Sequence, residues 1–241
     1  MHVLIVYAHP EPTSFNAALK DLAADTLRGL GHSVDISDLY AEGFDPREGP
    51  EHYPTRAAAD RFSALTEQRF ASDLERLPAD VHRELDRLER ADLLVLQFPM
   101  WWHAPPAILK GWLDRVFIYG GRYTSRMRYD TGYYRDRRAL VSLTTGAPAA
   151  AFGPGSRGGD LEVLLHPLHY SLHYMGYTVL PPFTAHGVQS GGVTYRSDEG
   201  FQALLEEHKR AWIRRLQHLD QDNPLAFPGW DDWDEFGAAL A

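Results

Sequence analysis

The chain has 241 residues, of which 44% are hydrophobic and 12% aromatic, and it carries a formal net charge of −9. These values predict one globular domain with a sizeable core, and they argue against nucleic acid or an anionic membrane as the main partner. Because the sequence contains no cysteine, disulfides, thiolate catalysis and cysteine-liganded metals are excluded.

The first predicted elements are a strand, a helix and a second strand. Residues Val3–Ala8 are a continuous apolar run, as expected for a strand buried on both faces of a parallel sheet. Thr13-Ser14 offers an N-cap for a helix over Phe15–Leu30, and His32–Asp38 is the second strand. This order predicts a right-handed parallel sheet. The N-terminus lacks the charged region of a signal peptide and no stretch reaches the roughly 20 apolar residues of a membrane span, so we expect a cytoplasmic protein.

A long excursion is predicted next, from Ala41 to about Pro78, because this segment is rich in charged residues, proline and glycine. A loop of this length in a compact domain is either functional or an arm that packs on a partner chain. A helix over Asp80–Arg90 and a strand over Asp92–Gln97 follow it.

An aromatic loop joins this strand to a helix predicted over Ala107–Phe117. It contains Trp101, Trp102 and His103. Ligands of open α/β sheets bind at the carboxyl ends of the strands, so the aromatic faces suggest a platform for a flat ring. The alternative is that both tryptophans are ordinary core or interface aromatics.

The rest of the chain continues the alternation of strands and helices. The predicted elements are a strand over Ala139–Thr144, a loop of small residues over Ala147–Gly159, a helix over Asp160–Met175, a fifth strand region near Phe183–Val188 and a helix over Ser197–Leu219. We therefore expect one domain over residues 1–241, with the excursion at about 41–78 and a C-terminal tail at about 222–241. Because the tail cannot fold alone, we expect it to lie on the body or on a neighbouring subunit.

Three loops at predicted strand ends supply three kinds of contact. The helix start at Thr13–Asn16 favours a phosphate, since free backbone N–H groups and the helix dipole attract negative charge there. The loop with Trp101 and Trp102 offers aromatic surface, and the loop after Thr144 offers hydroxyls and backbone N–H groups that Gly146 leaves open. Together these contacts suggest a flavin. No G-x-G-x-x-G follows the first strand, so a nicotinamide cofactor held in a Rossmann turn is not expected.

Three motifs carry a resemblance to a known family. AHPEPTSFNAALK (Ala8–Lys20), QFPMWWHAPPAILKGWLDRVF (Gln97–Phe117) and SLTTGAP (Ser142–Pro148), in this order and separation, resemble the flavodoxin-like NAD(P)H:quinone oxidoreductases of the DT-diaphorase family. GYTVLPPFTAHGV (Gly176–Val188) extends the likeness over nearly the whole chain. We therefore predict a three-layer α/β, flavodoxin-like fold with strand order 2-1-3-4-5, whose site lies where the order reverses between strands one and three.

The resemblance also implies an activity and an assembly. It implies a homodimer with FAD at the subunit interface, ping-pong transfer of a hydride from NAD(P)H to flavin N5, and then transfer to a quinone in the same pocket. FMN in place of FAD is the alternative cofactor. No metal is expected.

The resemblance assigns roles to matching positions of this chain. The cofactor would be held by His9, Thr13, Ser14, Phe15, Asn16 and Ala18 at its diphosphate and adenosine, by Pro99, Met100, Trp101, Trp102 and His103 along its ring, and by Thr144, Thr145, Gly146, Ala147 and Phe152 at its pyrimidine side. The substrate would meet Trp102, His103 and Tyr123, the last reaching across the dimer. The catalytic candidates are Gly146 and Ala147, as backbone donors to the reduced ring, and Arg157.

Departures from the family pattern concern the loop after Thr145. The family places a tyrosine and a histidine there, where this chain has Phe152 and Gly158. Neither can take a proton, so hydride transfer would rely on backbone donors or on Arg157, whose alternative role is that of a solvated loop cation. His103 stands where the mammalian enzyme has an aromatic residue, which suggests a different quinone preference.

Other interpretations of the sequence compete with this one. His166, His169 and His173 fall at i, i+3 and i+7, so one helical face could present them to a metal, although polar histidines at a surface or dimer interface are the simpler interpretation. The rival functions are a regulatory flavoprotein partner of a glutathione-gated potassium efflux system and an FMN-type reductase of azo or nitro compounds. A pure electron carrier fits less well, because bulky loops and an excursion would cover its flavin edge.

Overall fold

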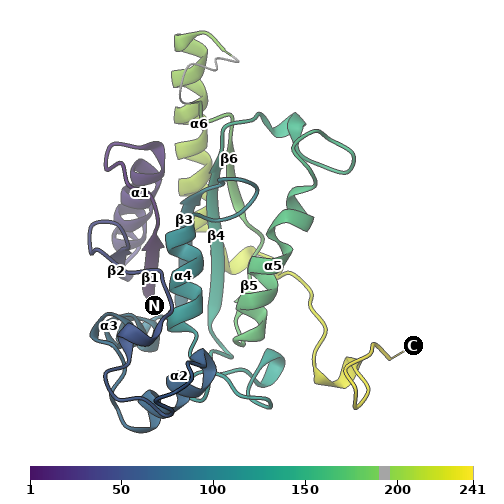
Figure 1. Ribbon diagram of the computed structural model, residues 1–241. Coiled ribbons are helices and arrows are strands. Elements are labelled where there is room, and N and C mark those ends of the chain that lie inside the picture. Colours follow the sequence, from purple (N-terminus) through teal and green to yellow (C-terminus); the bar gives the residue numbers. More distant parts are fainter. Residues whose placement is uncertain (190–195, 241) are drawn as a thin grey trace.

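The computed structural model describes residues 1–189 and 196–240. They form a three-layer α/β fold in which a parallel sheet lies between two layers of helices (Figure 1). The strand order is β2-β1-β3-β4-β5, with β6 also paired to β4, and every pair is parallel. This confirms the predicted architecture and strand order.

The elements follow the predicted alternation. The strands are β1 (His2–Tyr7), β2 (Ser33–Asp38), β3 (Leu93–Pro99), β4 (Arg138–Thr145), β5 (Thr178–Val179) and β6 (Phe183–His186). The helices are α1 (Phe15–Gly29), α2 (Ala64–Asp73), α3 (Ala79–Arg90), α4 (Ala107–Val116), α5 (Leu161–Tyr174) and α6 (Asp198–Gln217). The predicted fifth strand region is two short strands, since the intervening Pro181 and Pro182 cannot donate to a ladder.

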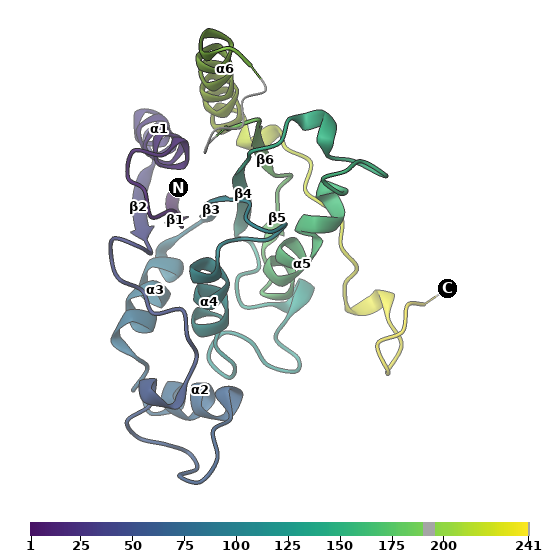
Figure 2. The same ribbon diagram turned by 45° about the horizontal axis from the view of Figure 1, so that its top comes forward.

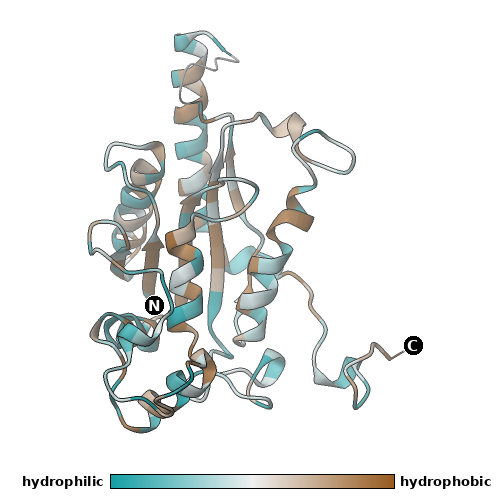
Figure 3. Ribbon diagram, in the orientation of Figure 1, coloured by the Kyte–Doolittle hydropathy of each residue, from teal (hydrophilic) through white to brown (hydrophobic). Residues whose placement is uncertain are grey.

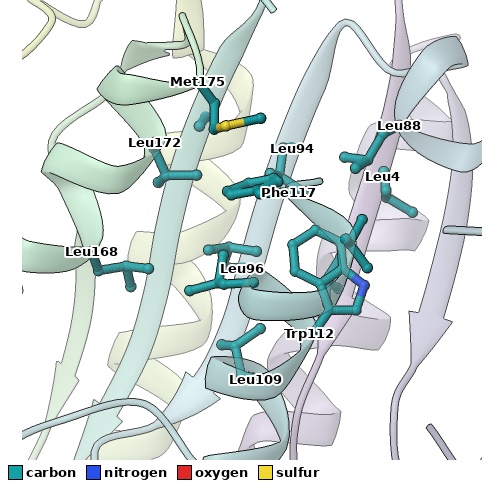
Figure 4. Close-up of a cluster of buried hydrophobic side chains, with 14 of the residues drawn as sticks. Leu4, Leu88, Leu94, Leu96, Leu109, Trp112, Phe117, Leu168, Leu172 and Met175 are labelled. Carbon is teal, nitrogen blue, oxygen red and sulfur yellow. The ribbon is translucent and has the colours of Figure 1, made fainter. Parts of the chain in front are cut away.

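Both faces of the sheet are buried, which explains the continuous apolar runs of its central strands. On one face, alternate residues such as Val3, Ile5 and Val95 pack against α1 and α6. On the other face, Leu4, Leu94 and Leu96 pack against α3, α4 and α5 (Figures 2 and 4). Figure 3 shows hydrophobic residues concentrated in the central strands, and mixed with hydrophilic ones along the covering helices.

The excursion at 41–78 contains α2, which the sequence interpretation treated as loop; that part of the prediction was wrong. The helix is held by buried polar side chains rather than by an apolar stripe. The carboxylate of Glu67, 1% exposed, accepts from the Ala57 N–H and from Arg56 Nε, both at 2.8 Å. The Gln68 side chain donates to the Asp114 carbonyl at 3.0 Å and accepts from the Tyr119 N–H at 3.1 Å. These bonds fix the excursion beside α4.

The C-terminal tail lies on the body over its first half. The Leu225 N–H donates to the Val179 carbonyl of β5 at 2.8 Å, and Trp230 Nε1 donates to Thr131 Oγ1 at 2.9 Å. Its far end extends away from the sheet (Figures 1 and 2), and Phe236 there is 88% exposed.

None of the helices in the described ranges combines the length and the apolar character that a membrane span requires.

Candidate functional site

A pocket of about 460 Å³ lies at the carboxyl ends of β1, β3 and β4. This is where the strand order reverses, the usual ligand site of an open α/β sheet. All three predicted loops contribute to it. Of the predicted cofactor contacts, the pocket is lined by His9, Ser14, Phe15, Asn16, Pro99, Met100, Trp101, Thr144 and Gly146.

The first loop presents the start of α1 to this pocket. The Ser14 hydroxyl caps the helix by accepting from the Ala17 N–H at 3.1 Å. The backbone N–H groups of Phe15 and Asn16 have no hydrogen-bond acceptor in the described part of the chain. These two donors and the positive end of the helix dipole therefore remain available for an anion.

Two neighbours of this helix start are less available. The Thr13 N–H and hydroxyl both donate to the Glu11 carboxylate, at 2.9 and 2.6 Å, so Thr13 already has an anionic partner. His9 Nδ1 accepts from the Glu11 N–H at 3.0 Å, so the neutral ring carries its proton on Nε2 as a donor. Burial lowers the pKa of His9 below its usual value, which favours this neutral form.

Buried hydrogen bonds connect the first loop to the third. Asn16, 3% exposed, donates from Nδ2 to Thr144 Oγ1 at 2.8 Å, and its Oδ1 accepts from Gln97 Nε2 at 2.8 Å. The side chains come from α1, β4 and β3. They hold the start of α1 at a fixed distance from the end of β4.

The aromatic loop is a tight turn that displays its side chains. Trp101 and Ala104 exchange backbone hydrogen bonds at 3.0 and 3.1 Å, and the two residues between them, Trp102 and His103, have φ of +51° and +61°. Positive φ at both central positions is the arrangement that glycine or asparagine usually supplies, so this turn stores backbone strain. It leaves Trp101 42% and Trp102 95% exposed. Neither is a core aromatic.

The third loop keeps its backbone donors open. The N–H groups of Gly146 and Ala147 have no acceptor among residues 1–189 and 196–240. A Cβ placed on Gly146 would meet only the Val188 carbonyl oxygen at 3.8 Å, so the protein itself does not require glycine there. Thr145 is engaged elsewhere, because its hydroxyl donates to the Ala147 carbonyl at 2.9 Å and lies 3.0 Å from His186 Nδ1.

The two departures from the family pattern are packed together. A Cβ on Gly158 would lie 2.8 Å from the Ala151 carbonyl oxygen and 3.1 Å from the Phe152 ring. A histidine at position 158 therefore does not fit this loop as it stands. Phe152 lines a separate pocket of about 730 Å³ behind the loop, and Arg157 is exposed.

The remaining predicted residues lie outside the 460 Å³ pocket. Trp102 and His103 follow Trp101 on the turn and are exposed, and Ala18 lies one turn into α1. Tyr123 belongs to an aromatic cluster elsewhere, where its ring is 5.5 Å from Tyr174, which in turn is 5.0 Å from Tyr129. Trp233 of the tail extends this cluster, with its ring 4.8 Å from Tyr129.

The three histidines of α5 have separate environments. His166 stacks on Tyr170, and His173 donates from Nε2 to the Pro228 carbonyl at 2.9 Å. His169 is only 4% exposed, contrary to the expectation of a surface or interface histidine, and burial lowers its pKa to about 4. Within the residues described, no three histidine or acidic side chains are grouped so that they could hold a metal ion.

Sequence reasoning missed one wall of the pocket. The wall is formed by Val188, Gln189, Phe201 and Leu205, with Glu11 beside the helix start. The spacing of four between Phe201 and Leu205 places both on one face of α6, but periodicity alone does not say that this face meets a pocket.

Comparisons with known proteins agree with this geometry. The family model described as the flavodoxin-like fold matches residues 1–213. The mouse ribosyldihydronicotinamide dehydrogenase (quinone) is 38% identical over 232 residues, which cover 95% of this chain and 96% of that protein. A crystal structure of a Klebsiella pneumoniae protein assigned as a quinone reductase superposes with a TM-score of 0.86 at 32% identity, over 97% of this chain and 91% of the other.

Two further matches bear on the rival interpretations. An Enterobacter ancillary protein of a glutathione-regulated potassium-efflux system is 33% identical over 184 residues, 76% of this chain and 82% of that protein. The structure of general stress protein 14 from Treponema denticola in complex with FMN has a TM-score of 0.59 at 25% identity, over 91% of this chain and 99% of the other.

Proposed function

The chain belongs to the flavodoxin-like family of NAD(P)H:quinone oxidoreductases, and we propose that it binds FAD in the 460 Å³ pocket and uses it to reduce quinones with NAD(P)H. The observation that carries this proposal is the convergence, at the switch point of the sheet, of a helix N-terminus, exposed aromatic rings and backbone N–H groups without an acceptor in the described ranges.

The anionic part of the cofactor would lie at the start of α1. The N–H groups of Phe15 and Asn16 and the Nε2 proton of His9 are the donors for the diphosphate. Thr13 would join them only if its bonds to Glu11 were exchanged for bonds to phosphate. Phe201 and Leu205 supply apolar surface beside this part of the pocket.

The ring would lie against Met100, Trp101 and Trp102. The N–H groups of Gly146 and Ala147 would face its pyrimidine side, where Gly146 leaves room for close approach. A flavin bound here would supply hydride transfer from NAD(P)H to a quinone through N5, in a ping-pong cycle. Fixed N–H donors cost no reorganisation, so they stabilise the negative charge that develops beside them.

Proton supply in this chain differs from the family pattern. Neither Phe152 nor Gly158 has an acidic or basic group, so the backbone donors would hold the charge and water at the open side of the pocket would supply the protons. His103 is exposed on the turn, where its ring can donate a hydrogen bond to a quinone oxygen. Arg157, also exposed, is the only guanidinium on this loop and would attract an anionic substrate.

The open side suggests a homodimer. Trp102 is 95% exposed, and Tyr123 lies in a different part of the same chain, so a partner subunit would bring its Tyr123 cluster over the ring. The substrate pocket would then be formed by residues of both subunits.

The purified protein provides the direct test. We expect flavin absorbance, release of FAD on acid treatment, binding of added FAD at micromolar concentration or below, a dimer by light scattering, and NADH- or NADPH-dependent reduction of menadione. Absence of flavin absorbance together with failure to bind FAD or FMN would refute the proposal.

The similarity to the potassium-efflux ancillary protein supports one alternative, a regulatory flavoprotein. Flavin binding with negligible menadione turnover, together with capture of a potassium-efflux transporter, would favour that function. Release of FMN and faster turnover of an azo dye than of menadione would favour an azo or nitro reductase.

A further inference from the structure

A row of polar side chains interrupts one apolar face of the sheet just below the pocket. On the face that packs against α1 and α6, Leu93, Val95 and Leu140 are apolar, but the next positions outward are Gln97 and then Ser142 and Thr144. Their exposures are 1%, 0% and 4%. Polar groups this deeply buried destabilise a fold unless they are hydrogen-bonded.

The side-chain amide of Gln97 is hydrogen-bonded to a residue of the pocket. Its Nε2 donates to Asn16 Oδ1 at 2.8 Å, and Asn16 Nδ2 donates to Thr144 Oγ1 at 2.8 Å. Asn16 and Thr144 line the pocket, whereas Gln97 does not. Gln97 Oε1 and the neighbouring Ser142 Oγ have no partner in the described residues, so burial of Gln97 is not explained by its own hydrogen bonding.

The direction of these hydrogen bonds determines whether the Thr144 hydroxyl can donate its proton to a ligand in the pocket. A hydroxyl has one proton, and Thr144 Oγ1 already accepts from Asn16, so the Thr144 proton is free to point at a ligand. If Gln97 did not hold Asn16 Oδ1, the Asn16 amide could turn over and accept from Thr144. The Thr144 proton would then be used inside the protein.

Building on the proposed function, we propose that Gln97 is a positioning residue for the flavin: it fixes the Asn16 amide so that Thr144 donates its hydroxyl proton into the pocket. The residue touches no ligand itself. It acts through two hydrogen bonds, and its effect should therefore disappear when Thr144 has no hydroxyl.

A double-mutant cycle on FAD affinity tests this inference. We expect Gln97→Met in the full-length protein to weaken FAD binding about tenfold, the effect of losing one hydrogen bond of about 1.4 kcal/mol. In a Thr144→Val background the same change should alter FAD affinity less than about twofold. Ser142→Ala is the matched control, since Ser142 is the cross-strand neighbour of Gln97 and is equally buried but makes no bond to Asn16; it should leave FAD affinity unchanged.

The outcomes separate the two proposals. If the wild-type chain binds no flavin, the proposed function fails, whatever the variants do. If the wild type binds FAD but Gln97→Met binds it equally well, or if the Gln97 and Thr144 effects simply add, Gln97 is only a structural residue and the inference is overturned. Should Gln97→Met not fold, Gln97→Glu assayed at alkaline pH serves in its place: once ionised, the carboxylate can only accept, so it should turn the Asn16 amide and give the same weakening and the same non-additivity.

Discussion

The two ends of the pocket are built in different ways. At the phosphate end, Asn16 at the start of α1 is 3% exposed and is joined by hydrogen bonds to Gln97 and Thr144 of the sheet. At the ring end, Trp102 is 95% exposed on a turn with two positive φ angles. The phosphate end is therefore fixed by hydrogen bonds to the core of the chain, and the ring end is exposed on the surface.

This difference indicates which part of the site one chain can complete. The phosphate end is organised before a ligand arrives, so binding there costs little ordering of the protein. The ring end has aromatic surface on one side only. It requires cover from the cofactor, the substrate or a second subunit, and affinity and specificity should therefore respond to different residues.

The largest effect is expected at the fixed end, from Asn16→Leu. Losing the amide leaves Gln97 Nε2 and Thr144 Oγ1 buried without this partner, which should lower the free energy of unfolding by about 4 kcal/mol and weaken FAD binding at least about a hundredfold. Urea unfolding and FAD titration measure the two effects. Asp25→Leu, on the exposed side of α1, should change neither, and a fully stable Asn16→Leu protein would show that this end is not held by the buried amide.

The next effect tests whether the acid sensitivity of the fold lies outside both ends. His169 has an ordinary pKa of 6.5 when unfolded and about 4 when folded, so the unfolded state binds more protons between these values. Stability should be complete above pH 6.5 and fall by about 3 kcal/mol as the pH drops to 4. His169→Phe should flatten this pH dependence in chemical unfolding, whereas His166→Phe, on the exposed histidine one turn earlier, should flatten it far less, because burial lowers the His169 pKa more than the neighbouring His166 does. An unchanged slope in His169→Phe would mean that other groups cause the loss.

Trp102→Ala probes the open end. Because the side chain is exposed, we expect the free energy of unfolding to change by less than about 0.5 kcal/mol. FAD affinity or menadione KM should worsen about tenfold, the usual value of one stacked aromatic ring. The control Val163→Ala, another exposed apolar residue, should affect neither. A large loss of stability in Trp102→Ala would contradict the distinction between the two ends.

The smallest effect is expected from Ser14→Ala at the cap of α1. Loss of the bond to the Ala17 N–H should cost about 1 kcal/mol of stability. FAD binding should also weaken, about threefold, because the frayed helix start holds its donors less firmly. Asp160→Ala removes the corresponding cap of α5 and should lower stability by a similar amount while leaving FAD affinity intact. Equal FAD affinities in the two variants would show that the cap stabilises the helix without serving the pocket.

Local signals in the sequence were sufficient for much of the fold. The helix predicted over Phe15–Leu30 spans Phe15–Gly29, because its cap and its apolar spacing are both encoded within a few residues. The excursion was harder to predict. Helix α2 buries Glu67 and Gln68, and a polar residue becomes a core residue only through partners that lie far away in the sequence.

In the candidate site, too, local sequence signals were predictive, whereas features that depend on distant residues were not. The three loops were identifiable from unusual residues at strand ends, and the structure brings them together in one pocket. Gln97 was not identified as a site residue, because a glutamine at the end of an apolar strand is expected to mark the point where the strand reaches solvent. The left-handed turn at Trp102 and His103 also gave no signal, since tryptophan rarely adopts positive φ and a single histidine beside it is too weak an indication.

The backbone hydrogen bond from the Leu225 N–H to the Val179 carbonyl has a consequence for solubility. Strand β5 is two residues long and lies at the end of the sheet path, where unpaired N–H and C=O groups can pair with another chain. The returning tail occupies that position, so it acts as a protective border for the sheet. A chain shortened before Leu225 should keep its pocket and yet aggregate through the uncovered edge.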